Sequence, residues 1–263
     1  MLPRLQLFEF NDAAWAPAAL RRSIIESLSV TLDRARVLKP LVAPFADFLE
    51  QTRAQTVIEL ASGAGGPARI FIRELQAAGV TLPRFVLSDL YPAVDAWQAL
   101  QQEFPGVVEY EPEPVDATAI PPRLVGVRTI INALHHFPPE LAQRVLLGAC
   151  EGASGVFVAE GLVRNPLSFA AMAPSGVLAL MRSPLNGSTT LEKLQRAMLT
   201  WLTPASIAAS VWDGTVSSMR CYSEHELREM VKPLGDSWEW KLGHFQYNAL
   251  GRGTWFSGVR RQR

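Results

Sequence analysis

The sequence predicts an α/β fold in which a largely parallel sheet is covered by helices on both faces. Between residues 56 and 160, short β-rich segments alternate with single segments of helical length. Parallel strands need a long crossover between them, and a helix is its usual form. Near the end of the chain, two further β-rich segments over 238–246 and 254–260 are joined by a loop that contains glycine, which predicts an antiparallel pair.

Composition bounds the class of protein. The 263 residues are 48% hydrophobic and 19% charged, and they fit one α/β domain with an insertion. Basic and acidic residues number 25 each, so the broad positive surface of a nucleic-acid-binding protein is not expected. The longest apolar run, 166–181, is interrupted by Pro174 and Gly176, which argues against a membrane span. Cys150 and Cys221 lack metal-ligand spacing, so we expect no metal and a reducing, cytoplasmic location.

The first 53 residues form a predicted N-terminal helical arm. A helix is expected over 17–37 because apolar residues recur at every fourth position, namely Leu20, Ile24, Leu28 and Leu32. Lys39-Pro40 should end this helix, since a residue before proline avoids helical dihedral angles. A second short helix is expected over about 44–53.

Residues 54–162 form the predicted ligand-binding core. Strands are expected over 56–60, 84–89, 107–111, 129–132 and 155–160, and helices over 67–78, 93–103 and 139–149. Residues 163–220 interrupt this alternation with four prolines, several glycines and one predicted helix around 190–201. A stretch this long is predicted to be an inserted substrate cap. Residues 221–263 complete the single predicted domain with a helix over 223–234, capped by Ser223 and Glu226, and the two terminal strands.

A glycine-rich loop, ELASGAGG, follows the first strand from Glu59 to Gly66. Glycines let a ligand approach the backbone closely, and the next helix begins with unpaired N–H groups. Gly63 to Ala68 also matches the dinucleotide pattern G-x-G-x-x-A, which keeps an NAD-dependent oxidoreductase open as an alternative. Glu59 favours a cationic ligand instead, because a carboxylate beside the loop would repel a pyrophosphate.

Polar residues also follow the next three strands. Asp89 follows the second, Asp116 the third and Asn132 the fourth. Ligands of open parallel sheets bind at the carboxyl ends of the strands. A carboxylate at Asp89 can accept from two ribose hydroxyls, and one at Asp116 can accept from an exocyclic adenine amine. The pattern predicts a nucleoside site at this edge.

With the ELASGAGG loop, the acid of FVLSDL, the tripeptide VDA and NALHHF, the sequence resembles the class I S-adenosylmethionine-dependent methyltransferases over roughly residues 55–160 and the closing hairpin. The resemblance implies a Rossmann-like, seven-stranded sheet with the last strand antiparallel. It implies S-adenosylmethionine as cofactor and S-adenosylhomocysteine as product. The residues it assigns to the cofactor are Glu59, Ala61, Ser62, Gly63, Gly65, Asp89, Leu90, Asp116, Ala117 and Asn132.

Two departures limit what this resemblance implies. Ala61 stands where the family usually has its first glycine, and its methyl group could narrow the loop. The flanking segments FNDAAWAPAALR and VWDGTVSSMRCYSEHEL are similar to a bacterial subgroup of the family whose substrate is not assigned. The resemblance therefore implies the chemistry and leaves the acceptor open.

Methyl transfer is an in-line displacement, so the protein must align the reactants and, for a poor nucleophile, remove a proton. His136 and His135 follow the fourth strand and are the first candidates for the base, although such residues also pack or cap a turn. Asp213 is the second candidate. For the acceptor, an aromatic wall, a carboxylate and a guanidinium are predicted from Trp212, Asp213 and Arg220. Further acceptor contacts are predicted for Trp15, Arg21, Glu160 and Tyr222. The alternative is an Asp213–Arg220 ion pair that steadies a loop.

The sequence thus predicts transfer of a methyl group to O or N of a small molecule, with natural-product biosynthesis as the expected setting. Three alternatives stay open: another reaction on the same fold, an NAD-dependent oxidoreductase, and a non-catalytic protein that binds the cofactor and a protein partner. The oligomeric state is left as monomer or homodimer. No nucleic acid or membrane partner is expected.

Overall fold

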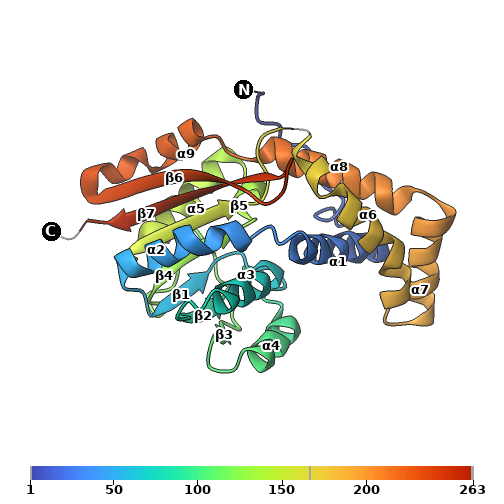
Figure 1. Cartoon of the computed structure of the whole chain (residues 1–263), viewed down its shortest axis with the longest axis horizontal. Helices are drawn as coiled ribbons and strands as arrows, with labels where there is room; N and C mark the ends of the chain where they lie inside the picture. The colour runs from blue at the N-terminus through green and yellow to red at the C-terminus, as the bar shows by residue number, and fades with distance from the viewer. Residues whose placement is uncertain (1, 166, 262–263) are drawn as a thin grey trace. The chain divides into compact units, whose positions relative to one another are not determined.

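The structure is a computed structural model that describes residues 2–165 and 167–261. Pro166, where the predicted apolar run begins, lies outside the described residues. Two compact units are present (Figure 1). The first unit combines residues 1–37, 162–221 and 246–252, and the second combines 38–161, 222–245 and 253–263. Over the described ranges, no helix is both long and apolar enough to cross a bilayer.

The second unit contains one seven-stranded sheet. Its strands are β1 Thr56–Glu59, β2 Arg84–Leu87, β3 Val108–Tyr110, β4 Val127–Ile131, β5 Gly155–Glu160, β6 Trp238–Gln246 and β7 Arg252–Arg260, in the order β3-β2-β1-β4-β5-β7-β6. Strands β1 to β5 pair in parallel, and β7 pairs with β5 in the antiparallel sense. The predicted seven-stranded sheet with its antiparallel last strand is confirmed. The chain reverses direction across the sheet between β1 and β4, which is where open α/β sheets bind ligands.

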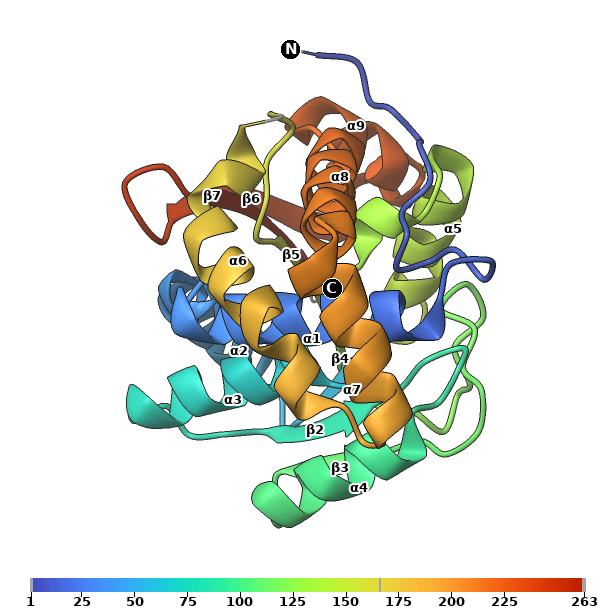
Figure 2. The same cartoon turned by 90° about the vertical axis from the view of Figure 1, so that its right-hand side faces the viewer.

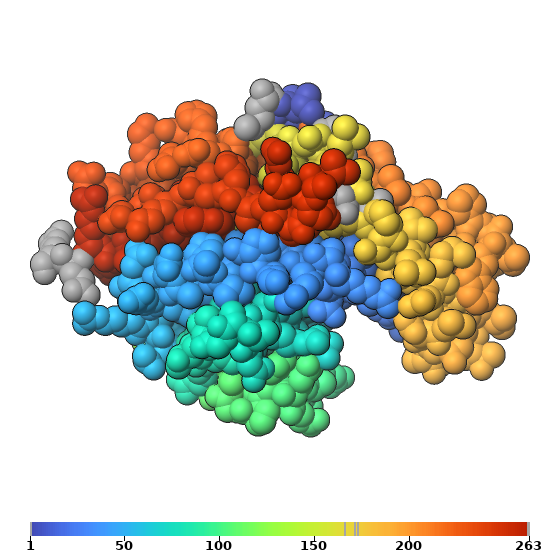
Figure 3. Space-filling view, viewed as in Figure 1, coloured from blue at the N-terminus to red at the C-terminus, as the bar shows by residue number. Residues whose placement is uncertain are grey.

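Helices cover both faces of this sheet. They are α2 Val42–Thr52, α3 Gly66–Ala77, α4 Val94–Glu103, α5 Pro139–Cys150 and α9 Glu224–Val231. Successive strand residues point to opposite faces, so Val156 joins the core beneath α5 and α9, whereas Phe157 joins the aromatic cluster of Phe45 and Phe48 on α2. Helix α2 also lies beside the carboxy-terminal strands, where Lys241 Nζ donates to Gln51 Oε1 at 3.1 Å (Figure 3).

The first unit is helical. Its helices are α1 Ala18–Arg34, α6 Ala173–Arg182, α7 Thr190–Ala197 and α8 Ala205–Arg220, with a π-helical turn, η5 Met198–Leu202, after α7. Helices α6, α7 and α8 all pack against α1. The N-terminal arm up to residue 37 and the predicted cap therefore belong to one compact unit, whereas α2 lies in the other.

Helices α6 and α8 correct the prediction that the cap contains one helix, around 190–201, and otherwise loops. The segment from Ala205 to Arg220 is rich in Ala and Ser and has a glycine at its middle, a composition that we read as a loop. Gly214 has a packing reason: a Cβ there would overlap the ring of Phe169. Because that close approach needs glycine, the residue marks a contact between helices and not the end of one.

Candidate functional site

In the glycine-rich loop after β1, every second residue from 61 to 65 has a left-handed backbone conformation. The φ angles of Ala61, Gly63 and Gly65 are +52°, +52° and +78°. Glycine adopts this region readily, whereas the Cβ of Ala61 makes it unfavourable by about 1 kcal/mol. Ala61 thus adopts the left-handed conformation in spite of its Cβ. No atom lies within 4 Å of the place where a Cβ of Gly63 would be, so a ligand can approach the backbone there.

Asp89, directly after β2, holds this loop in place. Its Oδ2 accepts from the backbone N–H of Gly63 at 2.8 Å, and its Oδ1 accepts from the N–H of Tyr91 at 2.9 Å. On the other side of the loop, Trp97 Nε1 donates to the carbonyl of Gly63 at 2.9 Å. Each carboxylate oxygen has two lone pairs, so the half-buried Asp89 retains acceptor capacity for a ligand hydroxyl. Leu90 beside it is 48% exposed.

Asp116 is exposed after β3, and Thr118 orients it. Its Oδ1 accepts from the N–H of Thr118 at 2.8 Å and from its hydroxyl at 2.7 Å. These bonds lower the pKa of Asp116, so the carboxylate stays ionised at neutral pH. Its neighbour Ala117 packs against the core. We did not predict the role of Thr118, although Asp-x-Thr is typical of a turn in which the aspartate caps the next residues.

Two buried side-chain atoms at the ends of β1 and β4, Glu59 Oε2 and Asn132 Nδ2, lack hydrogen-bond partners in the described part of the chain. Glu59 is 2% exposed and its Oε2 receives no hydrogen bond. Asn132 has φ +53°, its Oδ1 accepts from the N–H of Gly161 at 2.6 Å, and its Nδ2 donates to nothing. Buried polar atoms are normally satisfied, and exceptions are candidates for ligand contacts. An unpaired carboxyl oxygen and an unpaired amide N–H fit a ligand that carries both an ammonium and a carboxylate group.

Burial raises the pKa of the Glu59 carboxyl to about 8. The unfolded chain releases this proton near the ordinary value of 4.5, whereas the folded chain keeps it up to about 8. The folded state thus binds more protons in this interval, and its stability falls as pH rises. We expect Glu59→Gln to stabilise the ligand-free protein by a few kcal/mol at about pH 8 and by little at about pH 5, measured by urea unfolding. An effect that does not change with pH would contradict this prediction.

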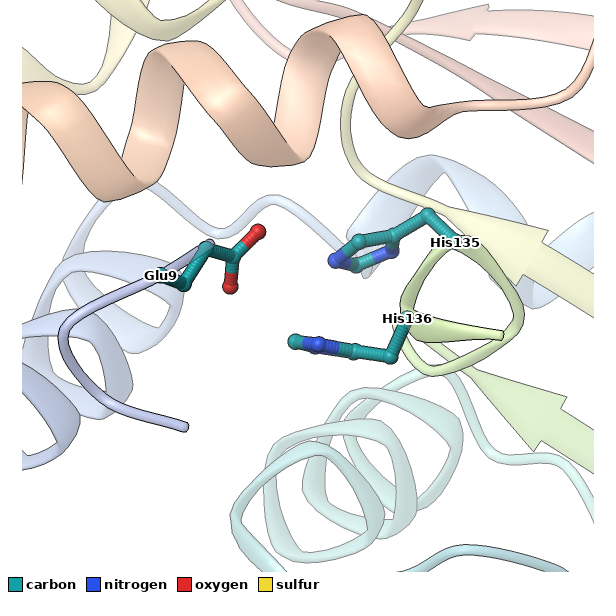
Figure 4. A group of neighbouring side chains, drawn as sticks. All are labelled: Glu9, His135 and His136. Atoms are coloured by element: carbon teal, nitrogen blue, oxygen red, sulfur yellow. The ribbon is translucent and has the colours of Figure 1, made fainter. Parts of the chain in front are cut away.

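His135 and Glu160 form a buried pair. The backbone N–H of His135 donates to Glu160 Oε1 at 3.0 Å, and its Nδ1 lies 2.7 Å from Glu160 Oε2. A carboxylate oxygen accepts, so Nδ1 is the ring nitrogen that donates to Glu160 Oε2. His136 lies next to it on the short helix η2 Leu134–His136, with ring centroids 4.2 Å apart (Figure 4). The sequence suggested a substrate contact for Glu160, and the structure brings it to His135.

In the first unit, helix α8 positions two of the predicted residues. Asp213 is buried, and its two carboxylate oxygens accept from the N–H groups of Phe10 at 2.7 Å and Asn11 at 3.0 Å. Its burial raises its pKa. Arg220 is also buried, and its Nη1 lies 2.9 Å from Glu9 Oε1. The carboxylate beside Arg220 is therefore that of Glu9, which we did not predict, and Asp213 instead holds the N-terminal arm.

The first unit also contains an apolar pocket of about 450 Å³, lined by Phe8, Phe10, Leu20, Ala205, Ala208, Ala209 and Trp212. Trp212 Nε1 donates to the carbonyl of Phe8 at 2.9 Å, and the two rings lie 5.3 Å apart. Trp15, 69% exposed, contacts the ring of Phe8 with centroids 5.8 Å apart. Phe8 and Phe10 were missed, although their alternation in LFEF close to Trp15 was an available signal.

Two other predicted acceptor residues have separate positions. Arg21, on α1, is half-buried, and its Nε has no partner among the residues that the structure describes. Tyr222 belongs to the second unit, where it is buried and its hydroxyl donates to the carbonyl of Phe137 at 2.5 Å. These contacts are compatible with packing roles, and the predicted acceptor contacts of both residues stay predictions.

No protein-family model matches this sequence, and no curated protein matches it significantly. Solved structures do resemble it. Plantazolicin methyltransferase BpumL, determined in complex with SAH, has a TM-score of 0.56 at 9% identity, covering 96% of this chain and 94% of that one. The methyltransferase domain of bacterial CtHen1 has a TM-score of 0.52 at 11% identity, over 85% of this chain and 99% of that one.

A putative O-methyltransferase from Nostoc punctiforme has a TM-score of 0.52 at 10% identity. It is matched over 98% of this chain, which spans 64% of that longer one. Together with the strand order β3-β2-β1-β4-β5-β7-β6, these likenesses define the fold as that of the class I S-adenosylmethionine-dependent methyltransferases. The fold predicted from the sequence motifs is confirmed.

Proposed function

We propose that this protein is an S-adenosylmethionine-dependent methyltransferase that acts on O or N of a small molecule. One observation carries the proposal: a buried carboxylate without a partner, Glu59, ends β1 beside a loop that leaves open space at Gly63. Burial raises the pKa of Glu59 to about 8 and so keeps the ligand-free carboxyl protonated near neutral pH; its ionised form is costly unless a cation neutralises it. The methionine ammonium of the cofactor is such a cation.

The other strand ends supply acceptors and a donor for the rest of the cofactor. In this proposal Asp89 accepts from the ribose hydroxyls and Asp116 from the adenine amine, while the Asn132 amide donates to the methionine carboxylate. Ala61, Ser62, Gly63 and Gly65 contribute backbone to the cradle, with Leu90 and Ala117 beside the nucleoside. When bound, S-adenosylmethionine supplies an electrophilic methyl group.

The chain's own residues then have two tasks. His135 is the proposed base: Glu160 fixes its tautomer and leaves Nε2 as the nitrogen that takes a proton from the acceptor hydroxyl or amine. His136, which the sequence placed slightly ahead of His135, becomes the second candidate in this proposal, and Asp213 the third. Asp213 is disfavoured because both of its oxygens already accept from backbone N–H groups.

The acceptor's chemical class follows from the pocket of the first unit. Its walls are almost entirely apolar and include Phe8, Phe10 and Trp212, which suits an aromatic or aliphatic group. The relative covered along nearly its whole length methylates plantazolicin by its name, which supports a natural product as the acceptor. Trp15 borders these aromatic residues, and Arg21 lies on the helix that contributes Leu20.

Replacing Asp89 by Ala is expected to weaken S-adenosylhomocysteine binding at least tenfold, or about 1.4 kcal/mol, because it removes the ribose acceptor and loosens Gly63. Isothermal titration calorimetry measures the change. Asp95→Ala, an exposed acid on α4, is the matched control and should bind like the wild type. Equal affinity in the Asp89 variant would count strongly against the proposed site.

The oxidoreductase alternative makes the opposite prediction. If the Gly63–Ala68 loop binds a dinucleotide, NAD raises the melting temperature and S-adenosylhomocysteine does not. A thermal-shift comparison of the two ligands separates these classes without a known acceptor. A different reaction on the same cofactor would instead be revealed by a product that has not gained one methyl group. A non-catalytic protein would bind the cofactor and yield no product.

A further inference from the structure

Helix α7 buries its charged side chains and exposes its leucines. Glu192 and Arg196 are 7% and 1% exposed, whereas Leu191 and Leu194 are 65% and 64% exposed. A surface helix normally turns its apolar stripe to the core and its charges to water. Helix α7 therefore has the opposite orientation to an ordinary surface helix: its charged side faces the protein and its apolar side faces solvent.

Ion pairs of the buried Arg196 hold α7 in this orientation. The two terminal guanidinium nitrogens of Arg196 lie 2.6 and 2.8 Å from the carboxylate oxygens of Glu26 on α1, and Nη2 is also 2.8 Å from Glu192. Glu192 in turn accepts from the hydroxyl and N–H of Ser188 at 2.6 and 3.0 Å. Rotating α7 to bury its leucines would leave these charges without partners, so the exposed apolar side is a fixed feature of the unit.

The apolar surface continues beyond α7. We define the leucine face as six side chains that are each more than half exposed: Leu185, Leu191, Leu194, Met198, Trp201 and Leu202. Trp201 Nε1 donates to the carbonyl of Met181 at 3.0 Å, which ties η5 to the end of α6. In Figure 2, α6 and α7 lie side by side on the side of the protein that faces the viewer.

The area of the leucine face matches one side of a protein interface. At these exposures the six side chains present roughly 700 Å², above the ~300–600 Å² of the largest patch on a typical monomer and near the ~800 Å² that each partner buries in a standard complex. No charged side chain belongs to it. Homodimer interfaces are the more apolar class, and a two-fold axis would bring the same patch of both chains together.

We propose that two copies of this chain associate through the leucine face. A membrane surface is less suited to it, because membrane-bound amphipathic helices are rich in exposed basic residues beside the apolar side. Of the two basic residues on α7, Arg196 is buried in ion pairs and only Lys193 is exposed, and the chain has no net charge. The association does not depend on the proposed methyl transfer.

The test is the mass in solution. Light scattering after size exclusion at about 100 µM, well above the micromolar Kd of even a weak interface of this size, should give twice the 28.9 kDa of one chain. The double variant L191E/L194E should have the mass of a single chain. The matched control V125E, a residue 72% exposed in the second unit, should remain dimeric.

Two measurements check that the L191E/L194E variant is folded like the wild type. Circular dichroism and the melting temperature of a dilute, monomeric sample should agree between wild type and L191E/L194E, because both replaced side chains face solvent in the single chain. A wild-type protein that stays at 28.9 kDa overturns the proposal. So does a dimer that persists in a folded L191E/L194E variant, or a monomer that sediments with anionic phospholipid vesicles through the same leucines.

Discussion

His135→Gln is expected to lower kcat for methyl transfer by about 100-fold or more while S-adenosylhomocysteine affinity stays within about twofold of the wild type. The imidazole is the proposed base, and its ring is oriented by Glu160 at 2.7 Å from Nδ1. Glutamine retains a polar side chain of similar reach and cannot take up a proton near neutral pH. The measurement is steady-state methyl transfer to an acceptor found by screening apolar natural products.

Two further variants make this prediction specific. Glu160→Gln should lower kcat less than His135→Gln does and shift the pH dependence of kcat, because the tautomer is no longer fixed by a carboxylate. His225→Gln, an exposed histidine on α9, is the matched control and should leave kcat unchanged. If His136→Gln abolishes transfer and His135→Gln does not, the base is His136 and the role given to the His135–Glu160 pair is wrong.

Arg196→Met is expected to destabilise the first unit by about 2 kcal/mol. The buried guanidinium is lost from the half-exposed Glu26 and from the buried Glu192, which keeps the exposed Arg22 at 3.3 Å. Methionine fills a similar volume, so the loss reports the ion pairs and not a cavity. Urea unfolding followed by circular dichroism measures it, and the two units are expected to unfold in separate transitions.

The control for Arg196 is an arginine whose ion pair is exposed. Arg228 and Glu224 lie four residues apart on α9, 2.9 Å from each other, with about half of each side chain exposed. Such pairs contribute about 0.5 kcal/mol or less, so Arg228→Met should unfold almost like the wild type. If the two variants lose the same free energy of unfolding, the ion pairs of the buried Arg196 contribute no more than an exposed pair, and the prediction is wrong.

Much of the second unit could be predicted from the sequence because its signals are local. Strand β5, the capping box at Ser223 and the glycine loop each depend on residues within a few positions of one another, and the structure contains all three. Asp89, Asp116 and Asn132 could also be located, since each follows a strand of a parallel sheet.

The tertiary structure decided which distant residues meet. His135 and Glu160 lie 25 positions apart and form a pair only because β4 and β5 are neighbours in the sheet. Asp213 and Arg220 are close in sequence, yet each has its nearest partners on the N-terminal arm, because helix α8 packs there.

The sequence by itself determined the fold class and the polar carboxyl edge, because alternation of strands and helices and the types of residue at strand ends are properties of short segments. Helical periodicity also located α7, where the charged and apolar residues form two sides. Which side faces the protein was decided only in three dimensions, by the position of Glu26 on α1. Leaving a buried charge without an ion-pair partner costs more free energy than leaving a leucine exposed to water. The periodicity of a helix does not show where in the fold that partner lies.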